Sequence, residues 1–114
     1  MIVTQKILYE LSAKEKESQR LWMAMDLRNS PEDLSQKMLN ALEPGTVMPI
    51  HPHHGSSESV VILRGKIRWI LYENGNKTER AALDANGWPR MLNVDKDRWH
   101  LLECLESGSM AANS

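Results

Sequence analysis

The sequence predicts an all-β single domain, a small barrel or sandwich, with one short helix at its N-terminus. Between residues 57 and 105, short runs rich in β-branched and aromatic residues alternate with turn signals. In the middle of this part, Asn74 and Gly75 form the pair that a two-residue hairpin turn favours, because both positions need a positive φ. The length of 114 residues suffices for one core, so a single domain is expected over residues 1–114.

The elements can be placed in order along the chain. Residues 4–19 are expected to be helical, because Ile7, Leu8 and Leu11 share one face and Thr4 can cap the first turn. We therefore expect a helix over about residues 1–20, a barrel over about 21–106 and a tail over 107–114. Strands are expected over residues 21–28, 36–42, 57–63, 66–72, 77–83, 91–94 and 99–105, with a loop at 86–89. By propensity alone, residues 36–42 fit either a helix or a strand.

Composition excludes several classes of function. The chain has 14 basic and 15 acidic residues and no basic stripe, so a nucleic-acid partner is not expected. No apolar run approaches the ~20 residues that cross a bilayer, and the first residues lack a signal-peptide pattern, so no membrane partner is expected. The single cysteine, Cys104, fits a reducing cytoplasm. These features predict a cytoplasmic protein.

The most informative segment is GTVMPIHPHHGSSESVVILRG, residues 45–65. His51 and His53 are two residues apart, so both imidazoles project from the same face if the segment is a strand. Glu58 follows after a short Gly-Ser turn and can approach them, and His100 lies in the late apolar run RWHLLECL. Three imidazoles and one carboxylate that converge in one cavity would form a transition-metal site.

Strand alternation predicts which other side chains share that cavity. If the four candidate ligands face inward, the interior also contains Val47, Pro49, Val60, Ile62, Leu102 and Cys104. A mostly apolar pocket with a few convergent polar groups is the usual composition of a small-ligand site.

Simpler interpretations of these residues remain open. The His-Pro-His-His cluster could be an exposed loop, and His100 could be a histidine at the edge of the core. His54 points opposite to His53 and is expected to be exposed, while Cys104 fits a small buried residue. The tryptophans fit packing or interface positions. Three arginines could orient an anionic substrate or could be solvated charges: Arg64, Arg68 and Arg90.

The spacing of residues 45–65 resembles the first motif of the cupin superfamily, G-x5-H-x-H-x3,4-E-x6-G. Gly45, His51, His53, Glu58 and Gly65 fill every fixed position. The second motif, G-x5-P-x-G-x2-H-x3-N, is matched by its histidine alone, His100. Asp95 and Asp97 replace its proline and glycine, and Cys104 stands in place of its asparagine.

This resemblance implies a double-stranded β-helix, or jelly-roll barrel. It also implies one divalent transition metal, zinc, iron, manganese, nickel or copper, held by His51, His53, Glu58 and His100. The fold leaves the activity open, because cupins include isomerases, dioxygenases, decarboxylases, storage proteins and regulators.

Within the superfamily the chain looks like the WbuC-type metalloproteins, found among other places in O-antigen gene clusters. The segments RNSPEDLSQKMLNALEPGT, SSESVVILRGKIRWILYENGN and RWHLLECLESGS carry the resemblance. Two features depart from it. Pro52 lies between the histidines, where a basic residue is more usual. Such proteins also continue past the equivalent of residues 106–108 into a further strand and an acidic, aromatic tail, whereas this chain stops at Ser114.

Three functions remain open from the sequence. The first is a metal-dependent enzyme, an isomerase or epimerase or an oxygenase, that acts on a sugar or another small polar metabolite and is linked to surface polysaccharide biosynthesis. The second is a metal-bound sensor or binding module without turnover, and the third is a structural cupin without metal. The catalytic residues are unknown, and Tyr72 and Glu103 are general-base candidates only by elimination.

A homodimer is expected, because small cupins bury apolar outer faces and edge strands in this way. The residues expected to offer apolar surface for it are Trp22, Trp69 and Leu105.

Overall fold

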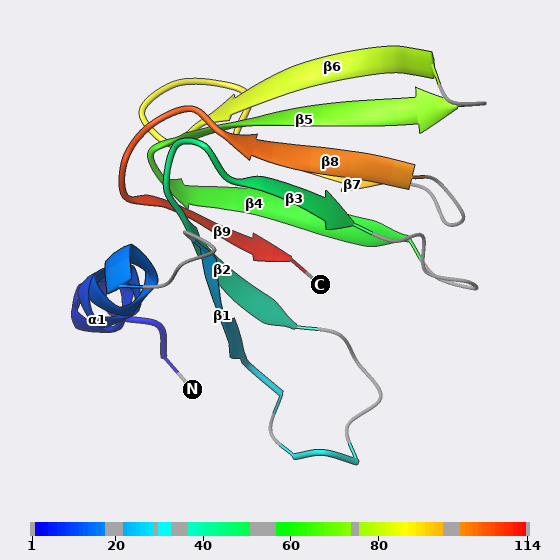
Figure 1. Ribbon diagram of the computed structural model, residues 1–114. Helices are drawn as coiled ribbons and strands as arrows, with labels where there is room; N and C mark the ends of the chain where they lie inside the picture. The colour runs from blue at the N-terminus through cyan, green and yellow to red at the C-terminus, as the bar shows by residue number, and fades with distance from the viewer. Residues whose placement is uncertain are drawn as a thin grey trace.

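The described residues form two antiparallel sheets and one helix (Figure 1). The computed structural model describes residues 2–17, 22–28, 30–32, 37–50, 57–73, 76–94 and 99–113. The sheets have the strand orders β1-β2-β9-β4-β7 and β3-β8-β5-β6, and they lie as two facing layers. The elements are α1 (Gln5–Glu17), β1 (Trp22–Asp26), β2 (Met38–Leu42), β3 (Val47–Ile50), β4 (Glu58–Arg64), β5 (Lys66–Glu73), β6 (Asn76–Asp84), β7 (Met91–Val94), β8 (Trp99–Cys104) and β9 (Ser109–Asn113).

Helix α1 begins as the sequence predicts. The Thr4 hydroxyl oxygen accepts a hydrogen bond from the Ile7 N–H at 3.4 Å, which satisfies one of the unpaired donors of the first turn. The helix packs against the outer face of β1 and β2 (Figure 1), where Leu11 joins Leu39, Ala41 and Met110 in a buried cluster. Within the described part of the chain, no helix is long and apolar enough to cross a bilayer.

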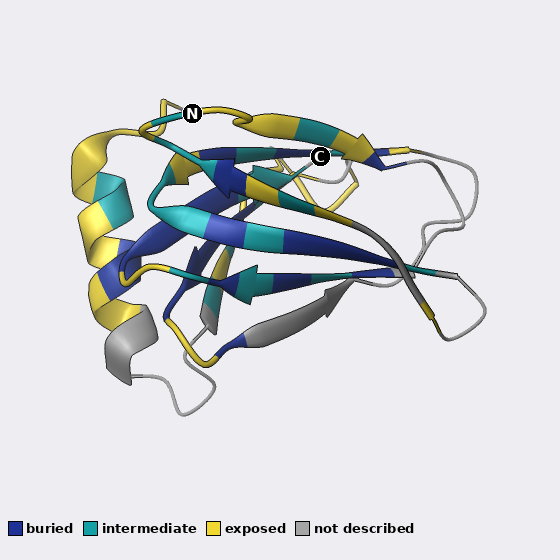
Figure 2. Cartoon of the chain, turned by 90° about the horizontal axis from the view of Figure 1, so that it is seen from above, coloured by how far each residue is buried: buried dark blue, intermediate teal, exposed yellow. Residues whose placement is uncertain are grey.

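The barrel interior follows the expected strand alternation. Along β4, Glu58, Val60 and Ile62 are buried, whereas the residues between them are at least partly exposed. Along β8, the buried residues are His100, Leu102 and Cys104. Figure 2 shows the buried residues concentrated in the strands, while most of the described part of α1 is exposed. The predicted register is therefore confirmed for β4 and β8, while the side chains of β3 lie outside the described residues.

The expectation of a tail over residues 107–114 is wrong. Ser109–Asn113 forms strand β9, which lies between β2 and β4 inside the five-stranded sheet. Its sequence, SMAAN, has no β-branched residue, so local propensity does not predict a strand. The strand forms because hydrogen-bonding partners flank it on both sides, with Ala111 opposite Asn40 on one side and Ile62 on the other.

Ser109 ties the start of β9 to the turn between β4 and β5. Its hydroxyl oxygen accepts a hydrogen bond from the Lys66 N–H at 3.0 Å and lies 2.6 Å from the Glu106 carbonyl oxygen, to which it donates. The side chain is fully buried. Gly65, in the turn itself, has φ +75 and lies against Ser109 so closely that a Cβ atom at this position would be 2.9 Å from the Ser109 Cα. Gly65 and Ser109 are therefore in close contact at this end of the barrel.

One proposed interface residue is not on the surface. Trp69 is only 6% exposed and belongs to the barrel core, so it cannot offer apolar surface to a second copy. It lies on β5 opposite Leu102 and alternates inward with Ile67 and Leu71. The sequence alone could not separate the two faces of this strand, because Ile67, Trp69 and Leu71 form an apolar stripe that would suit either.

Candidate metal centre

Two of the four expected ligands lie in the described residues, and the fold brings them together. Glu58 begins β4 in one sheet, and His100 is the second residue of β8 in the other. Their side chains are 4% and 2% exposed, and His100 Nε2 lies 3.6 Å from Glu58 Oε2. Glu58 and His100 are far apart in the sequence and lie in different sheets. Only the tertiary fold therefore brings the two side chains together.

This pair fits a divalent metal. Metal bonds to histidine nitrogen and carboxylate oxygen are about 2.0–2.2 Å long, so two donors 3.6 Å apart can both coordinate one ion. A carboxylate is costly to bury unless it is paired, hydrogen-bonded or bound to a metal. The neighbouring inward residues, Val60, Ile62 and Leu102, are apolar and keep bulk water away from both groups.

The other two expected ligands, His51 and His53, lie outside the described residues, as does His54. Strand β3 ends at Ile50, and the Cα partner of Ile50 in β8 is His100. The backbone of β3 therefore reaches the level of His100 directly before His51. Within the residues that the structure describes, no three histidine, cysteine, aspartate or glutamate side chains gather, since half of the expected ligand set falls in the segment 51–56.

Two asparagines that the sequence did not indicate orient the Glu58 carboxylate. Asn113 Nδ2 donates a hydrogen bond to Glu58 Oε1 at 2.8 Å, and Asn40 Nδ2 donates to Asn113 Oδ1 at 2.6 Å. The chain of side chains runs from β2 through β9 to β4, across three neighbouring strands. Asn113 bonds Oε1 of Glu58, and the other carboxylate oxygen, Oε2, faces His100. Such partners orient metal ligands and are part of the energetics of a metal site.

Asn113→Ala should therefore weaken metal binding without removing a ligand. We expect the dissociation constant to rise by about 10- to 100-fold, the range found when a hydrogen-bond partner of a ligand is lost. Competition with a chromophoric chelator measures it. Asn93→Ala is the matched control, because Asn93 lies exposed on β7 with its side chain bonded to Ser59, and it should leave the constant unchanged. Equal constants for both variants would rule out the orienting role of Asn113.

The proposed general bases do not face the barrel interior. Glu103 alternates with His100 and Leu102 along β8, and its carboxylate lies 3.3 Å from the Arg68 guanidinium. Tyr72 follows the inward-facing Leu71 on β5 and therefore belongs to the outer face. Both suggestions are wrong for the same reason, which is that elimination by residue type took no account of strand face.

Cys104 is buried, as the sequence predicts, but it lies away from the ligand pair. Its Sγ contacts the carbonyl oxygens of Leu42, at 3.4 Å, and Glu106, at 3.0 Å. Cys104 lies four residues beyond His100 on β8. Its role is therefore packing and local hydrogen bonding.

The three candidate arginines lie outside the barrel. Arg68 pairs with Glu103, the Arg90 guanidinium lies 4.4 Å from the centre of the Trp88 ring, and that of Arg64 lies 4.7 Å from the ring of Tyr9. None of them reaches the ligand pair, so the suggestion that they orient an anionic substrate at this site is wrong.

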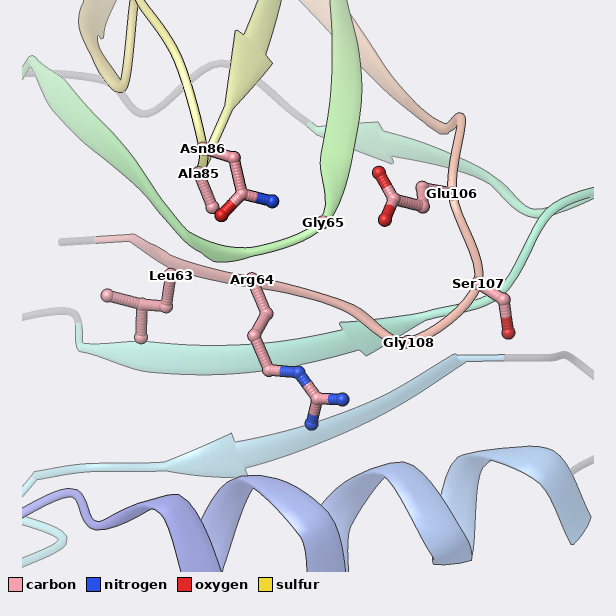
Figure 3. A pocket seen from close by; sticks show the side chains of 8 residues that line it. All are labelled: Leu63, Arg64, Gly65, Ala85, Asn86, Glu106, Ser107 and Gly108. Carbon is pink, nitrogen blue, oxygen red and sulfur yellow. The ribbon is translucent and has the colours of Figure 1, made fainter.

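A hollow lies at the end of β4 that is opposite to Glu58. It encloses about 300 Å³ (Figure 3). Glu58 and Leu63 are five residues apart on β4, which places the hollow about 16 Å from the candidate metal centre. Figure 3 shows Arg64 extending toward the helix, away from Glu106 and Asn86. The residues that line the hollow are Leu63, Arg64, Gly65, Ala85, Asn86, Glu106, Ser107 and Gly108.

Solved structures identify the fold that the two facing antiparallel sheets form. The chain has the cupin fold. It is similar to the cupin domain of an XRE-family transcriptional regulator from Enterobacter cloacae, with a TM-score of 0.62, 20% identity, and 81% of this chain and 90% of that one covered. It is also similar to oxalate oxidase in complex with the substrate analogue glycolate, with a TM-score of 0.63, 13% identity, and coverage of 84% and 51%.

A third similar structure is the capsular polysaccharide assembling protein CapF from Staphylococcus aureus, with a TM-score of 0.63 and 19% identity over 84% of this chain. The chain spans only 27% of that protein. The family is settled by a sequence model. Residues 3–83 match the family described as domain of unknown function DUF6016, so the chain belongs to that family. No curated protein matches the sequence.

Proposed function

We propose that this protein binds one divalent transition metal inside its barrel through His51, His53, Glu58 and His100. The observation that carries the proposal is the buried approach of His100 Nε2 to Glu58 Oε2 at 3.6 Å. With the ion bound, the site would act on or bind a small oxygen-containing metabolite. The identity of the ion stays open among zinc, iron, manganese, nickel and copper, because a mixed histidine and carboxylate shell suits all of them.

Several residues of the chain would have separate roles in metal binding. Neutral imidazole nitrogens would hold the ion, and the Glu58 carboxylate would offset part of its charge. Asn113 keeps that carboxylate in one orientation through its bond to Oε1. The apolar interior side chains exclude bulk water and so strengthen electrostatic interactions in the site. When bound, a divalent ion supplies Lewis acidity toward a carbonyl or hydroxyl oxygen of a ligand.

A sugar or a related polar metabolite of surface polysaccharide biosynthesis is the substrate class that we propose. The resemblance of the sequence to WbuC-type cupins supports this class. So does the fold similarity to the capsular polysaccharide assembling protein from Staphylococcus aureus. Two further similar folds carry small ligands, since one is described as an iron(II) enzyme in complex with its substrate and another as oxalate oxidase with glycolate.

A second candidate function is a sensor that binds a metabolite without turnover. The similarity to the cupin domain of a transcriptional regulator favours it, because the match covers 90% of that domain.

Elemental analysis of protein purified without added metal tests the proposal. We expect about one transition-metal ion per chain, released by a strong chelator together with a fall in thermal stability. A panel of sugars, nucleotide sugars and hydroxy acids, screened by thermal shift on the metal-loaded protein, would then find the ligand class. Turnover of a stabilising compound supports the enzyme, and stabilisation without turnover supports the sensor. A chain that neither contains nor takes up stoichiometric metal would refute the proposal.

A further inference from the structure

Trp69 places a buried hydrogen-bond donor beside the candidate metal centre. Its indole ring lies 6.4 Å from the ring of His100, centroid to centroid, at an interplanar angle of 48°. Trp69 is on β5 opposite Leu102, and the next inward residue on β5, Leu71, is opposite His100. The indole therefore lies next to the imidazole, one inward-facing position along the strands in the direction of Leu102.

The indole nitrogen of Trp69 is a buried donor. Trp69 Nε1 is buried, and within the described part of the chain no atom accepts its hydrogen bond. Trp69 belongs to a buried cluster that includes the apolar residues Ile67, Leu71 and Leu83. Most buried donors are satisfied, and leaving one unsatisfied costs about 1–3 kcal/mol. An oxygen atom of a small molecule bound in the barrel would supply the acceptor that the described residues lack.

We propose that the Trp69 indole N–H donates a hydrogen bond to an oxygen atom of the small molecule bound at the metal centre. This inference rests on the proposed function. An indole nitrogen donates and never accepts, so it selects a hydroxyl, carbonyl or carboxylate oxygen. The rings of His100 and Trp69 are neighbours, 6.4 Å apart between centroids, so one small molecule at the metal centre would be within reach of both. Trp69 is accordingly a positioning residue that fixes which end of the ligand lies deepest.

The bond is directly observable in the zinc-loaded protein. The chain has four tryptophans, so its ¹H–¹⁵N spectrum should contain four indole signals, and the signal that disappears in Trp69→Phe belongs to Trp69. Glycolate, which carries a carboxylate and a hydroxyl, should move this indole proton downfield by at least about 0.3 ppm, as expected when a weakly bonded donor gains a strong acceptor. Imidazole, which can occupy the metal but has no oxygen, should not produce this downfield shift.

Affinity provides the second readout. By calorimetry, Trp69→Phe should weaken glycolate binding by roughly tenfold while the zinc stoichiometry stays at one. Trp88→Phe is the matched control, because Trp88 is 79% exposed in the loop before β7, and it should change neither quantity. Phenylalanine keeps an aromatic ring in the core, and the three remaining indole signals report whether the fold is intact.

The outcomes separate this inference from the proposed function. Failure of the unaltered protein to bind zinc would refute the metal site itself. Zinc-loaded protein that binds no glycolate, or that binds it with no movement of the Trp69 signal and with equal affinity in Trp69→Phe, would refute the inference alone. In the last case the acceptor would be a resident water or the indole would serve packing only.

Discussion

His100→Ala is expected to abolish stoichiometric metal binding. His100 is buried and shares the barrel interior with Glu58, so removal of its imidazole deletes a donor and leaves a space that no nearby polar side chain of the described core can fill. The affinity should fall by more than the roughly 100-fold that marks loss of a ligand's hydrogen-bond partner. Elemental analysis after dialysis should then find less than about a tenth of an ion per chain. His51→Ala and His53→Ala should have the same effect.

His54→Ala is the control for this series. It lies in the same His-Pro-His-His run, and strand alternation predicts that its side chain faces away from His53. Its metal content should equal that of the unaltered protein. Full retention of metal in His100→Ala, His51→Ala or His53→Ala would reject the four-residue assignment, provided that circular dichroism shows a folded chain. Glu58→Gln should bind more weakly than the unaltered protein, because an amide cannot offset the charge of the ion.

Gly65→Ala is expected to destabilise the fold by about 3 kcal/mol. Two costs add at this position. A left-handed backbone conformation costs a residue with a Cβ about 1–2 kcal/mol, and Gly65 has φ +75. The new Cβ would also lie 2.3 Å from Ser109 Oγ and 2.9 Å from Ser109 Cα, and overpacking costs about 1–3 kcal/mol. Ser109 cannot simply rotate away, because its hydroxyl bonds the backbone of Lys66 and Glu106.

Two other glycines separate these costs. Gly108 has the same φ of +75, but its Cβ would meet only the end of the Arg64 side chain at 3.6 Å, so Gly108→Ala should cost about 1 kcal/mol. Gly87 is outside the left-handed region and its Cβ would lie 3.3 Å from the Asp84 carboxylate, which can move, so Gly87→Ala should cost less than about 0.5 kcal/mol. Urea unfolding measures all three. Equal losses at Gly65 and Gly108 would contradict the close approach of Ser109.

Much of the architecture was predictable because the signals are local. Met91–Val94 was expected over the same residues, and β2, β4, β5, β6 and β8 differ from the expected ranges by one or two residues at one or both ends. These strands carry β-branched or alternating apolar residues, and turn residues bound several of them. The side chains of β4 and β8 that face the interior were equally predictable. Side chains alternate between the two faces of a strand, so one residue known to face inward, here Glu58 or His100, fixes the rest.

The functional surroundings of Glu58 were not predictable in the same way. Asn113 is 55 residues away in sequence from the carboxylate that it orients, and it lies in a segment with no strand propensity of its own. Alternation of Ala111 and Asn113 with Met110 and Ala112 is present in the sequence, but it gains meaning only once β2 and β4 flank that segment. The inward position of Trp69 was not predictable from the sequence either.

The amino-acid order alone thus determines the period of each strand, the cap of α1 and the residues able to serve as ligands, because each depends on neighbours a few positions apart. The tertiary structure decides which face of an apolar strand is inside, which strand completes a sheet, and which distant side chains meet. Asn40, Asn113 and Trp69 join the site only there, since hydrogen bonds between strands and packing between sheets connect residues that the sequence keeps far apart.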